Sequence, residues 1–506
     1  MSLPPNTISL QKNTLTPFND PTNHQACARP VTDKLQIMTD NVNAKTAPNS
    51  LICRSLRDFS FPSLRKRVTD NVTHFRNPTM PFYCLVVLSV FAGLISAFAQ
   101  GAQRDNPFPT PSSKKGLQVQ MVDDALALGI KHAALNVNFA QLLDVSDPAH
   151  LKPNAGYLEH LDRQVKPLSD SGAVVSLILL YYRSGNQALD KPMLHPKYDK
   201  AAPNNLTAFN TATAEGAAAF SACVEFLAQR FSSTNALHGR VWNYIVGNEV
   251  NSHWFWYNMG RVGMEELADN YLSAVRATHT AVRKHSANAR VYLSLEHHWN
   301  IRYPGGDAQQ TFAGRPFIEY FAKKARDTNQ GGDFDWHIAF HPYPENLFEC
   351  RTWNDKSATH SPDTPRITFK NIEQLTQFVR RPELLYKGQP RRIILSEQGF
   401  HSPDTEEGQL RQAAAYAYAY QKIRDLDGID SFILHRHVDH GQEGGLNLGL
   451  WTRNKDSKNP AEPAAKKKIY EVFKAADTPA WPEAFQLALP IIGIKNWAEI
   501  AGANRE

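Results

Sequence analysis

The stretch "VWNYIVGNEV", residues 241–250, decides the fold prediction. Six of its first seven residues are apolar, aromatic or glycine, which is typical of a buried strand, yet Asn248 and Glu249 follow directly. A carboxylate beside a buried strand is costly unless other groups pair with it. The pattern therefore favours an architecture in which strands end at a shared polar site.

Seven further runs resemble this one, and amphipathic segments with apolar residues three and four positions apart alternate with them. The strand-like runs span 115–120, 132–139, 173–182, 241–249, 290–299, 334–344, 391–400 and 429–439, and the clearest helical patterns span 121–129, 217–231, 264–285, 371–381 and 408–426. Eight strand-then-helix units predict parallel strands closed into an α/β (β/α)8 TIM barrel. No glycine-rich nucleotide loop follows any strand, which disfavours an open doubly wound sheet.

The N-terminal part of the sequence has a different organisation. Residues 1–79 are rich in Asn, Thr, Ser and Pro, and we expect a disordered extension that is not translated if synthesis starts near Met80. Residues 80–99 are predicted to be a signal peptide, because Ala97-Phe98-Ala99 is a small-x-small cleavage site that would place the mature end at Gln100. The alternative is a signal anchor that stays in the membrane. Residues 100–114 are expected to be a linker, and residues 115–506 the catalytic domain.

Charge and cysteine content restrict the possible partners. The net charge is +6, but the 55 Lys and Arg residues are spread along the chain of 506 residues, so we expect no nucleic-acid partner. A membrane partner is expected only if the signal segment is retained. Cys223 and Cys350 are the two cysteines after the signal segment, and their spacing leaves open whether they pair.

Polar side chains end nearly every predicted strand, which is where a barrel of this kind builds its active site. Glu249 and Glu397 each follow directly after an apolar run. Two carboxylates across a barrel mouth suit glycoside hydrolysis, because one protonates the leaving oxygen while the other attacks the anomeric carbon. This chemistry requires no cofactor and no metal.

The motifs "GNE" (247–249), "SEQGF" (396–400) and "HPY" (341–343) resemble clan A of the glycoside hydrolases, the superfamily of retaining cellulases and β-glycosidases. The chain is also similar to a bacterial family of unknown function, number 5722. The clan resemblance implies that Glu249 is the acid/base and Glu397 the nucleophile, that Asn248 holds the sugar 2-hydroxyl and that Tyr343 donates to the nucleophile. The chain departs from the clan after the eighth strand, where "LHRHVDH" (434–440) stands in place of the usual Trp.

The remaining strand-end residues are predicted to contact a carbohydrate substrate. Aromatic rings stack on sugar faces, and Arg can pair with acidic groups on a polysaccharide. The predicted substrate-binding residues are Asn248, Asn138, Arg183, Glu296, His298, Trp299, His341, Tyr343, His435, His437 and Trp451. The sequence thus predicts an exported retaining glycoside hydrolase acting on poly- or oligosaccharides.

Two alternatives remain open. His341, His435, His437, His440 and Asp439 could belong to a metal-dependent barrel hydrolase, because His-x-His on one strand places both rings on one face. The order of these residues disfavours that class, which carries His-x-His on its first strand. The second alternative is a carbohydrate-binding barrel without activity, which would be expected to lack one of the two glutamates.

Overall fold

The computed structural model describes residues 106–147 and 150–502. The predicted extension and signal segment therefore lie outside the described residues. Within the described part of the chain, no helix is long and apolar enough to cross a membrane.

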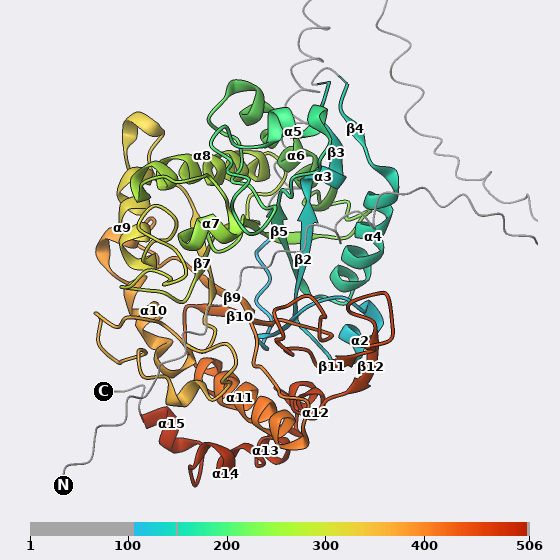
Figure 1. The fold of residues 1–506 in the computed structure, drawn as a ribbon, viewed down its shortest axis with the longest axis vertical. Helices are drawn as coiled ribbons and strands as arrows, with labels where there is room; N and C mark the ends of the chain where they lie inside the picture. The colour runs from blue at the N-terminus through green and yellow to red at the C-terminus, as the bar shows by residue number, and fades with distance from the viewer. Residues whose placement is uncertain (1–105, 148–149, 503–506) are drawn as a thin grey trace, which may run out of the picture. The chain divides into compact units, whose positions relative to one another are not determined.

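Eight parallel strands close into a barrel in the order β1-β10-β9-β8-β7-β6-β5-β2, which confirms the predicted TIM barrel (Figure 1). Each predicted run contains one of them. The strands are β1 (Lys115–Gln118), β2 (His132–Asn138), β5 (Val174–Leu180), β6 (Val241–Val246), β7 (Arg290–Glu296), β8 (Trp336–His341), β9 (Ile393–Gln398) and β10 (Ile429–Leu434). Strand β5, "VVSLILL", is buried along its whole length, as expected for a strand covered on both faces.

Helices surround these strands and supply the outer layer (Figure 1). They begin at side-chain caps in several places; Thr213, for example, accepts a hydrogen bond from the Gly216 N–H (3.1 Å) and starts α6. The α-helices are α2 (Val122–Ala127), α3 (Phe139–Leu142), α4 (Ala155–Asp170), α5 (Gln187–Met193), α6 (Ala214–Phe231), α7 (His253–Trp256), α8 (Met264–Arg283), α9 (Gly314–Ala325), α10 (Glu373–Phe378), α11 (Glu406–Arg424), α12 (Lys468–Ala475), α13 (Trp481–Ala484), α14 (Ala488–Ile492) and α15 (Ala498–Gly502).

Two short hairpins, which the strand pattern did not predict, are added to the barrel. One pairs β3 (Leu143–Asp144) with β4 (Lys152–Pro153), and the other pairs β11 (Trp451–Arg453) with β12 (Pro463–Lys466). Strands of two to four residues are too short to show an alternating pattern. They extend the loops that follow β2 and β10.

The core has two layers. Inward-facing side chains such as Ile178, Ile245 and Tyr292 fill the barrel interior, and a larger cluster packs between the strands and the helices. Cys223 and Cys350 are both buried, and neither forms a disulfide with another described residue. The described part of the predicted linker is packed: the Phe108 ring lies edge-to-face with Trp242 at 5.8 Å.

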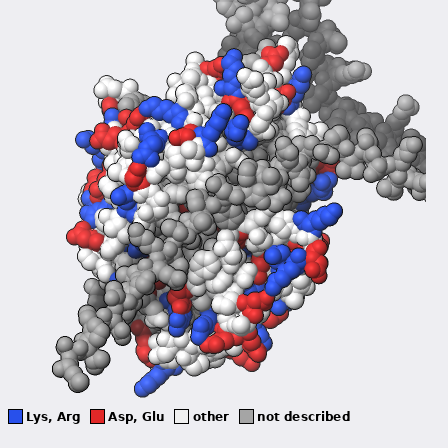
Figure 2. Space-filling view, in the orientation of Figure 1, with Lys and Arg blue, Asp and Glu red and all other residues white. Residues whose placement is uncertain are grey.

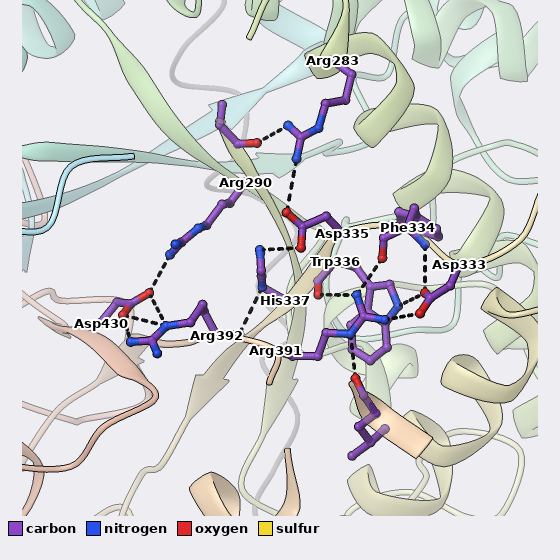
Figure 3. A network of polar contacts seen from close by, with 12 residues as sticks. Arg283, Arg290, Asp333, Phe334, Asp335, Trp336, His337, Arg391, Arg392 and Asp430 are labelled. Carbon is purple, nitrogen blue, oxygen red and sulfur yellow. Dashed lines mark hydrogen bonds and ion pairs between the residues drawn. The ribbon is translucent and has the colours of Figure 1, made fainter. Parts of the chain in front are cut away.

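Charged side chains join the strands at their amino-terminal ends, opposite the predicted site (Figure 3). Arg290 Nη1 binds Asp430 Oδ2 (2.7 Å), and Arg392 Nε binds Asp430 Oδ1 (3.0 Å), so one carboxylate links β7, β9 and β10. The buried Arg391 binds Asp333 Oδ2 (2.5 Å) and stacks over Trp336. This network stabilises the closed end of the barrel and leaves its mouth to other residues.

The surface carries both signs of charge. On the face seen in Figure 2, Lys and Arg residues lie beside Asp and Glu residues along the visible edges. Mixed charge of this kind creates no large field of one sign.

Candidate active site

Glu249 lies in a tight turn just beyond β6. The strand ends at Val246, and Gly247 and Glu249 both have positive φ (71° and 41°), which costs a non-glycine residue roughly 1–3 kcal/mol. The Glu249 N–H donates to Ser294 Oγ of β7 (3.0 Å), which fixes the turn. The strain is therefore maintained where it aims a carboxylate at the barrel mouth.

Glu397 reaches the same place from β9. Tyr343, which follows β8, donates its hydroxyl to Glu397 Oε1 at 3.0 Å. This bond fixes the direction in which the Glu397 carboxylate points.

His341, the last residue of β8, lies close to both carboxylates. Its Nδ1 is 2.9 Å from Glu249 Oε1, and its Nε2 is 3.1 Å from Ser396 Oγ. One oxygen of Glu249, one oxygen of Glu397 and one ring nitrogen of His341 all lie within 4.8 Å of one another. Carboxylates about 5–5.5 Å apart suit a retaining mechanism, whereas inverting enzymes need roughly 6.5–9.5 Å.

The two carboxylates have different surroundings. Burial raises the pKa of Glu249, and the charges of Glu397 and Glu296 raise it further, although the hydrogen bond from His341 acts in the opposite direction. Burial opposes protonation of His341, but its bond to Glu249 and the charge of Glu397 raise the pKa of His341 overall. Both shifts favour keeping a proton on the Glu249–His341 pair, as a general acid requires.

Glu296, the third carboxylate near the site, is already occupied by protein donors. Its Oε1 accepts from Asn251 Nδ2 (2.6 Å) and Ser252 Oγ (3.0 Å), and its Oε2 accepts from the His298 N–H (3.0 Å). Burial alone would raise the pKa of Glu296, but His298 and His297 lower it to about 2. Glu296 is thus a fixed anion that holds the loop after Glu249.

The predicted substrate contacts divide into open and occupied side chains. Asn248 is half-buried and Arg183 is exposed, and neither side chain has a hydrogen-bond or ion-pair partner among the described residues. Asn138 accepts from the N–H groups of Ala140 (3.1 Å) and Tyr182 (3.3 Å), so it caps α3. Asn248 and Arg183 therefore remain available to a ligand.

Three predicted contacts lie away from the open site. Trp299 is only 2% exposed and packs edge-on against Phe378, so the structure does not place it where a sugar can stack. The His437 side chain is fully buried against Asp124, at 2.8 Å. Trp451 donates to the same carboxylate (2.9 Å). Trp299 and His437 thus turn into the protein, and Trp451 is half-buried with its indole N–H held by Asp124.

His298 and His435 are each held by a neighbouring carboxylate. His298 Nδ1 is 2.6 Å from Glu296 Oε2, and its ring is buried. His435 Nε2 is 2.8 Å from Glu443 Oε1. Asp439 pairs instead with Lys467 (3.2 Å), so the residues proposed for a metal site do not converge on one another.

Among the described residues, two groups of side chains could offer metal ligands. One is Glu249, His341 and Glu397; the other is Glu296, His297 and His298. In both, a ring nitrogen already bonds a carboxylate oxygen, at 2.9 Å for His341 and 2.6 Å for His298. Hydrogen bonding within each grouping explains why its members lie together.

Two tyrosines near the carboxylates were missing from the predicted site. Burial and the charge of Glu397 raise the pKa of Tyr182, which follows β5. Burial and the charges of Glu249 and Glu296 raise the pKa of Tyr303, whose ring lies edge-to-face with Phe255 at 5.1 Å. Tyr182 ends a predicted strand and could have been included, whereas Tyr303 lies in a loop without a pattern.

A family profile covers the whole barrel. Residues 107–500 match the "Family of unknown function (DUF5722)". The chain belongs to this family. The match confirms the family resemblance drawn from the sequence, and no curated protein sequence matches the chain.

Solved structures with similar folds include three glycosidases. A family 39 glycoside hydrolase from Bacteroides cellulosilyticus WH2 is 13% identical with a TM-score of 0.48, and the alignment covers 73% of this chain and 64% of that one. A glucosidase from Croceicoccus marinus is 13% identical with a TM-score of 0.43, covering 73% and 65%. A β-glucosidase from Pyrococcus furiosus is 15% identical with a TM-score of 0.46, covering 73% and 86%. The chain thus spans less than two thirds of the first two proteins, and the function has to be argued from the site itself.

Proposed function

We propose that this DUF5722 protein is a retaining glycoside hydrolase that cleaves O-glycosidic bonds of poly- or oligosaccharides. The observation that carries the proposal is the pair Glu249 and Glu397, whose oxygens approach within 4.8 Å in different surroundings. One is buried with a raised pKa, and the other accepts a tyrosine hydroxyl. That combination suits a proton donor and a nucleophile acting at the same glycosidic bond.

The reaction proceeds in two displacements. A Glu397 oxygen forms a bond to the anomeric carbon while the bond from that carbon to the leaving oxygen breaks, and Glu249 gives the leaving oxygen its proton. A water molecule then attacks the anomeric carbon, its proton passes to Glu249, and the Glu397 carboxylate is released. The sugar keeps its anomeric configuration.

Neighbouring residues hold these groups in place. Tyr343 and His341 orient Glu397 and Glu249 through bonds of 3.0 and 2.9 Å. Since no described residue pairs with either side chain, the Asn248 amide beside the acid is available for a sugar hydroxyl and Arg183 for an acidic substituent. Orientation of this kind accounts for much of the rate that a hydrolase gains.

The test is a panel of aryl β-glycosides and neutral and acidic polysaccharides, with the first-formed anomer identified by proton NMR. Hydrolysis with retained configuration is expected. A sugar that binds without any hydrolysis would favour the non-catalytic barrel, and activity that depends on an added divalent metal would favour the metal hydrolase.

We also propose export. The support is the uncharged segment Pro81–Ala99 with its small-x-small site. N-terminal sequencing of protein recovered from the periplasm or medium should begin near Gln100. A membrane-bound product that retains residues 80–99 would indicate the anchor instead.

A further inference from the structure

Four polar side chains form a continuous hydrogen-bonded row at the barrel mouth, which we call the polar row: Asn136, Gln118, His435 and Glu443. Gln118 Nε2 donates to Asn136 Oδ1 at 3.2 Å, and the Gln118 side-chain oxygen contacts His435 Nδ1. His435 Nε2 is 2.8 Å from Glu443 Oε1. The row runs from β2 across β1 to the end of β10 and the loop that follows.

The polar row faces the inside of the barrel. Ala134 and Ile433 belong to the interior cluster, and side chains two positions apart on a strand point the same way, so Asn136 and His435 point inward as well. Leu117 belongs to the outer core, which leaves its neighbour Gln118 on the inner face. The inner face at the carboxyl ends of the strands is where a barrel holds its substrate.

The row lies directly beside the nucleophile. The backbone N–H of His435 donates to the backbone carbonyl oxygen of Gln398 at 2.8 Å, and Gln398 directly follows Glu397. Glu443 also lies close enough to Tyr343 for its charge to raise the pKa of that hydroxyl. A sugar whose anomeric carbon meets Glu397 therefore has this row along one side.

The row has hydrogen-bonding capacity that the protein leaves unused. Asn136 is exposed within β2, and its amide nitrogen has no partner among the described residues. Glu443 Oε2 is buried and has no partner within the described part of the chain, although buried polar atoms are nearly always paired. Sugar hydroxyls both donate and accept, so one ring can satisfy a donor and an acceptor at once.

We propose that the polar row is the wall of the subsite for the sugar that loses its glycosidic bond, and that it selects a neutral sugar through hydrogen bonds to ring hydroxyls. This inference rests on the proposed function. Both nitrogens of His435 are occupied by Gln118 and Glu443, so the ring orients its neighbours rather than contacting the sugar through a free nitrogen. Arg436, the cation beside the row, is already paired with Glu443. Among the described residues, the row therefore offers no unpaired cation to the carboxylate of a uronic acid.

The test compares a 2,4-dinitrophenyl glycoside that the wild-type enzyme hydrolyses with its 3-, 4- and 6-deoxyfluoro derivatives. Replacing a hydroxyl that the row contacts should lower the kcat/KM of the wild type by roughly 10–100-fold. In Asn136→Ala and Gln118→Met, the penalty at that same position should shrink to about threefold or less. Gln486→Met, an exposed residue after α13 whose amide bonds Pro482 O, is the matched control and should keep the wild-type pattern.

The outcomes separate this inference from the proposed function. If both variants show the same loss of kcat/KM as the wild type with each deoxyfluoro substrate, or equal losses at every position, the polar row does not contact the sugar. Continued hydrolysis would leave the proposed function standing in that case. Faster hydrolysis of a glucuronide than of the matching glucoside would overturn its preference for neutral sugars. A wild-type enzyme that hydrolyses no glycoside would overturn the proposed function and this inference together. Because Asn136 is exposed, the Asn136→Ala variant should fold even if the Gln118→Met variant does not, so the test can still be made.

Discussion

Removing His341 tests how the acid is held. His341→Ala deletes the 2.9 Å bond to Glu249 and leaves Ser396 without its partner on the ring. A hydrogen bond to a charged group contributes roughly 1.5–3 kcal/mol, which corresponds to a loss of about 10–150-fold if it is needed to place the acid. The loss should therefore appear in steps that need a proton from Glu249.

The assay is the ratio of kcat/KM for a phenyl glycoside to that for a 2,4-dinitrophenyl glycoside. The phenolate leaving group needs protonation, so its kcat/KM should fall by the full factor, whereas the dinitrophenolate needs no proton and should change by about threefold or less. The variant His279→Ala, at a half-buried position of α8 where the ring packs against Phe334, controls for the loss of an imidazole. Equal losses for both leaving groups would refute the role of His341 in holding the acid.

The pH profile supplies a second readout of the same variant. His341 lowers the pKa of Glu249 against the effects of burial and of Glu397, so removing His341 should raise that pKa further. A general acid is active below its pKa, and the alkaline limb of kcat/KM should therefore move to higher pH. An alkaline limb that moves to lower pH would contradict the assigned electrostatics.

Three further predictions concern other parts of the structure. Glu296→Gln should lose roughly 10–100-fold in kcat/KM, because this carboxylate positions neighbours and transfers no proton; a loss equal to that of Glu397→Gln would make it a catalytic residue. Tyr343→Phe removes the 3.0 Å donor to Glu397 and should lower kcat by about tenfold, with an unchanged circular dichroism spectrum. Arg391→Met at the closed end removes the cation bound to Asp333 and should cost about 3–5 kcal/mol in urea unfolding, while kcat/KM at 25 °C stays within about twofold.

The barrel could be predicted because its information is local. Each strand is an apolar run closed by polar residues, and all eight runs appear in the closed sheet. The run at 371–381 was overextended: its α-helix spans Glu373–Phe378, and a 3-10 turn, Phe369–Asn371, precedes it. Boundaries depend on the turn geometry that closes an element, which the apolar pattern does not record.

The site could be predicted only in part. Glu249 and Glu397 were identified from their positions, but the contact between His341 and Glu249 joins residues 92 positions apart and leaves no local pattern. Trp299 and His298 show a second difficulty. Both lie beyond a strand end, where the loop conformation sets the direction of each side chain, and Trp299 enters the core. Gln118 was missed because an amide in a short first strand looks like any solvated residue.

The central claim is that Glu249 and Glu397 perform separate steps of a double displacement, and azide rescue tests it most directly. Glu249→Ala with a 2,4-dinitrophenyl glycoside should still form the covalent intermediate on Glu397, and azide should release a glycosyl azide of retained configuration. Glu397→Ala lacks the nucleophile, so azide should attack the substrate itself and give the inverted azide. Proton NMR of the two products distinguishes the configurations. The same configuration from both variants, or the reverse assignment, would contradict the roles given to the two glutamates.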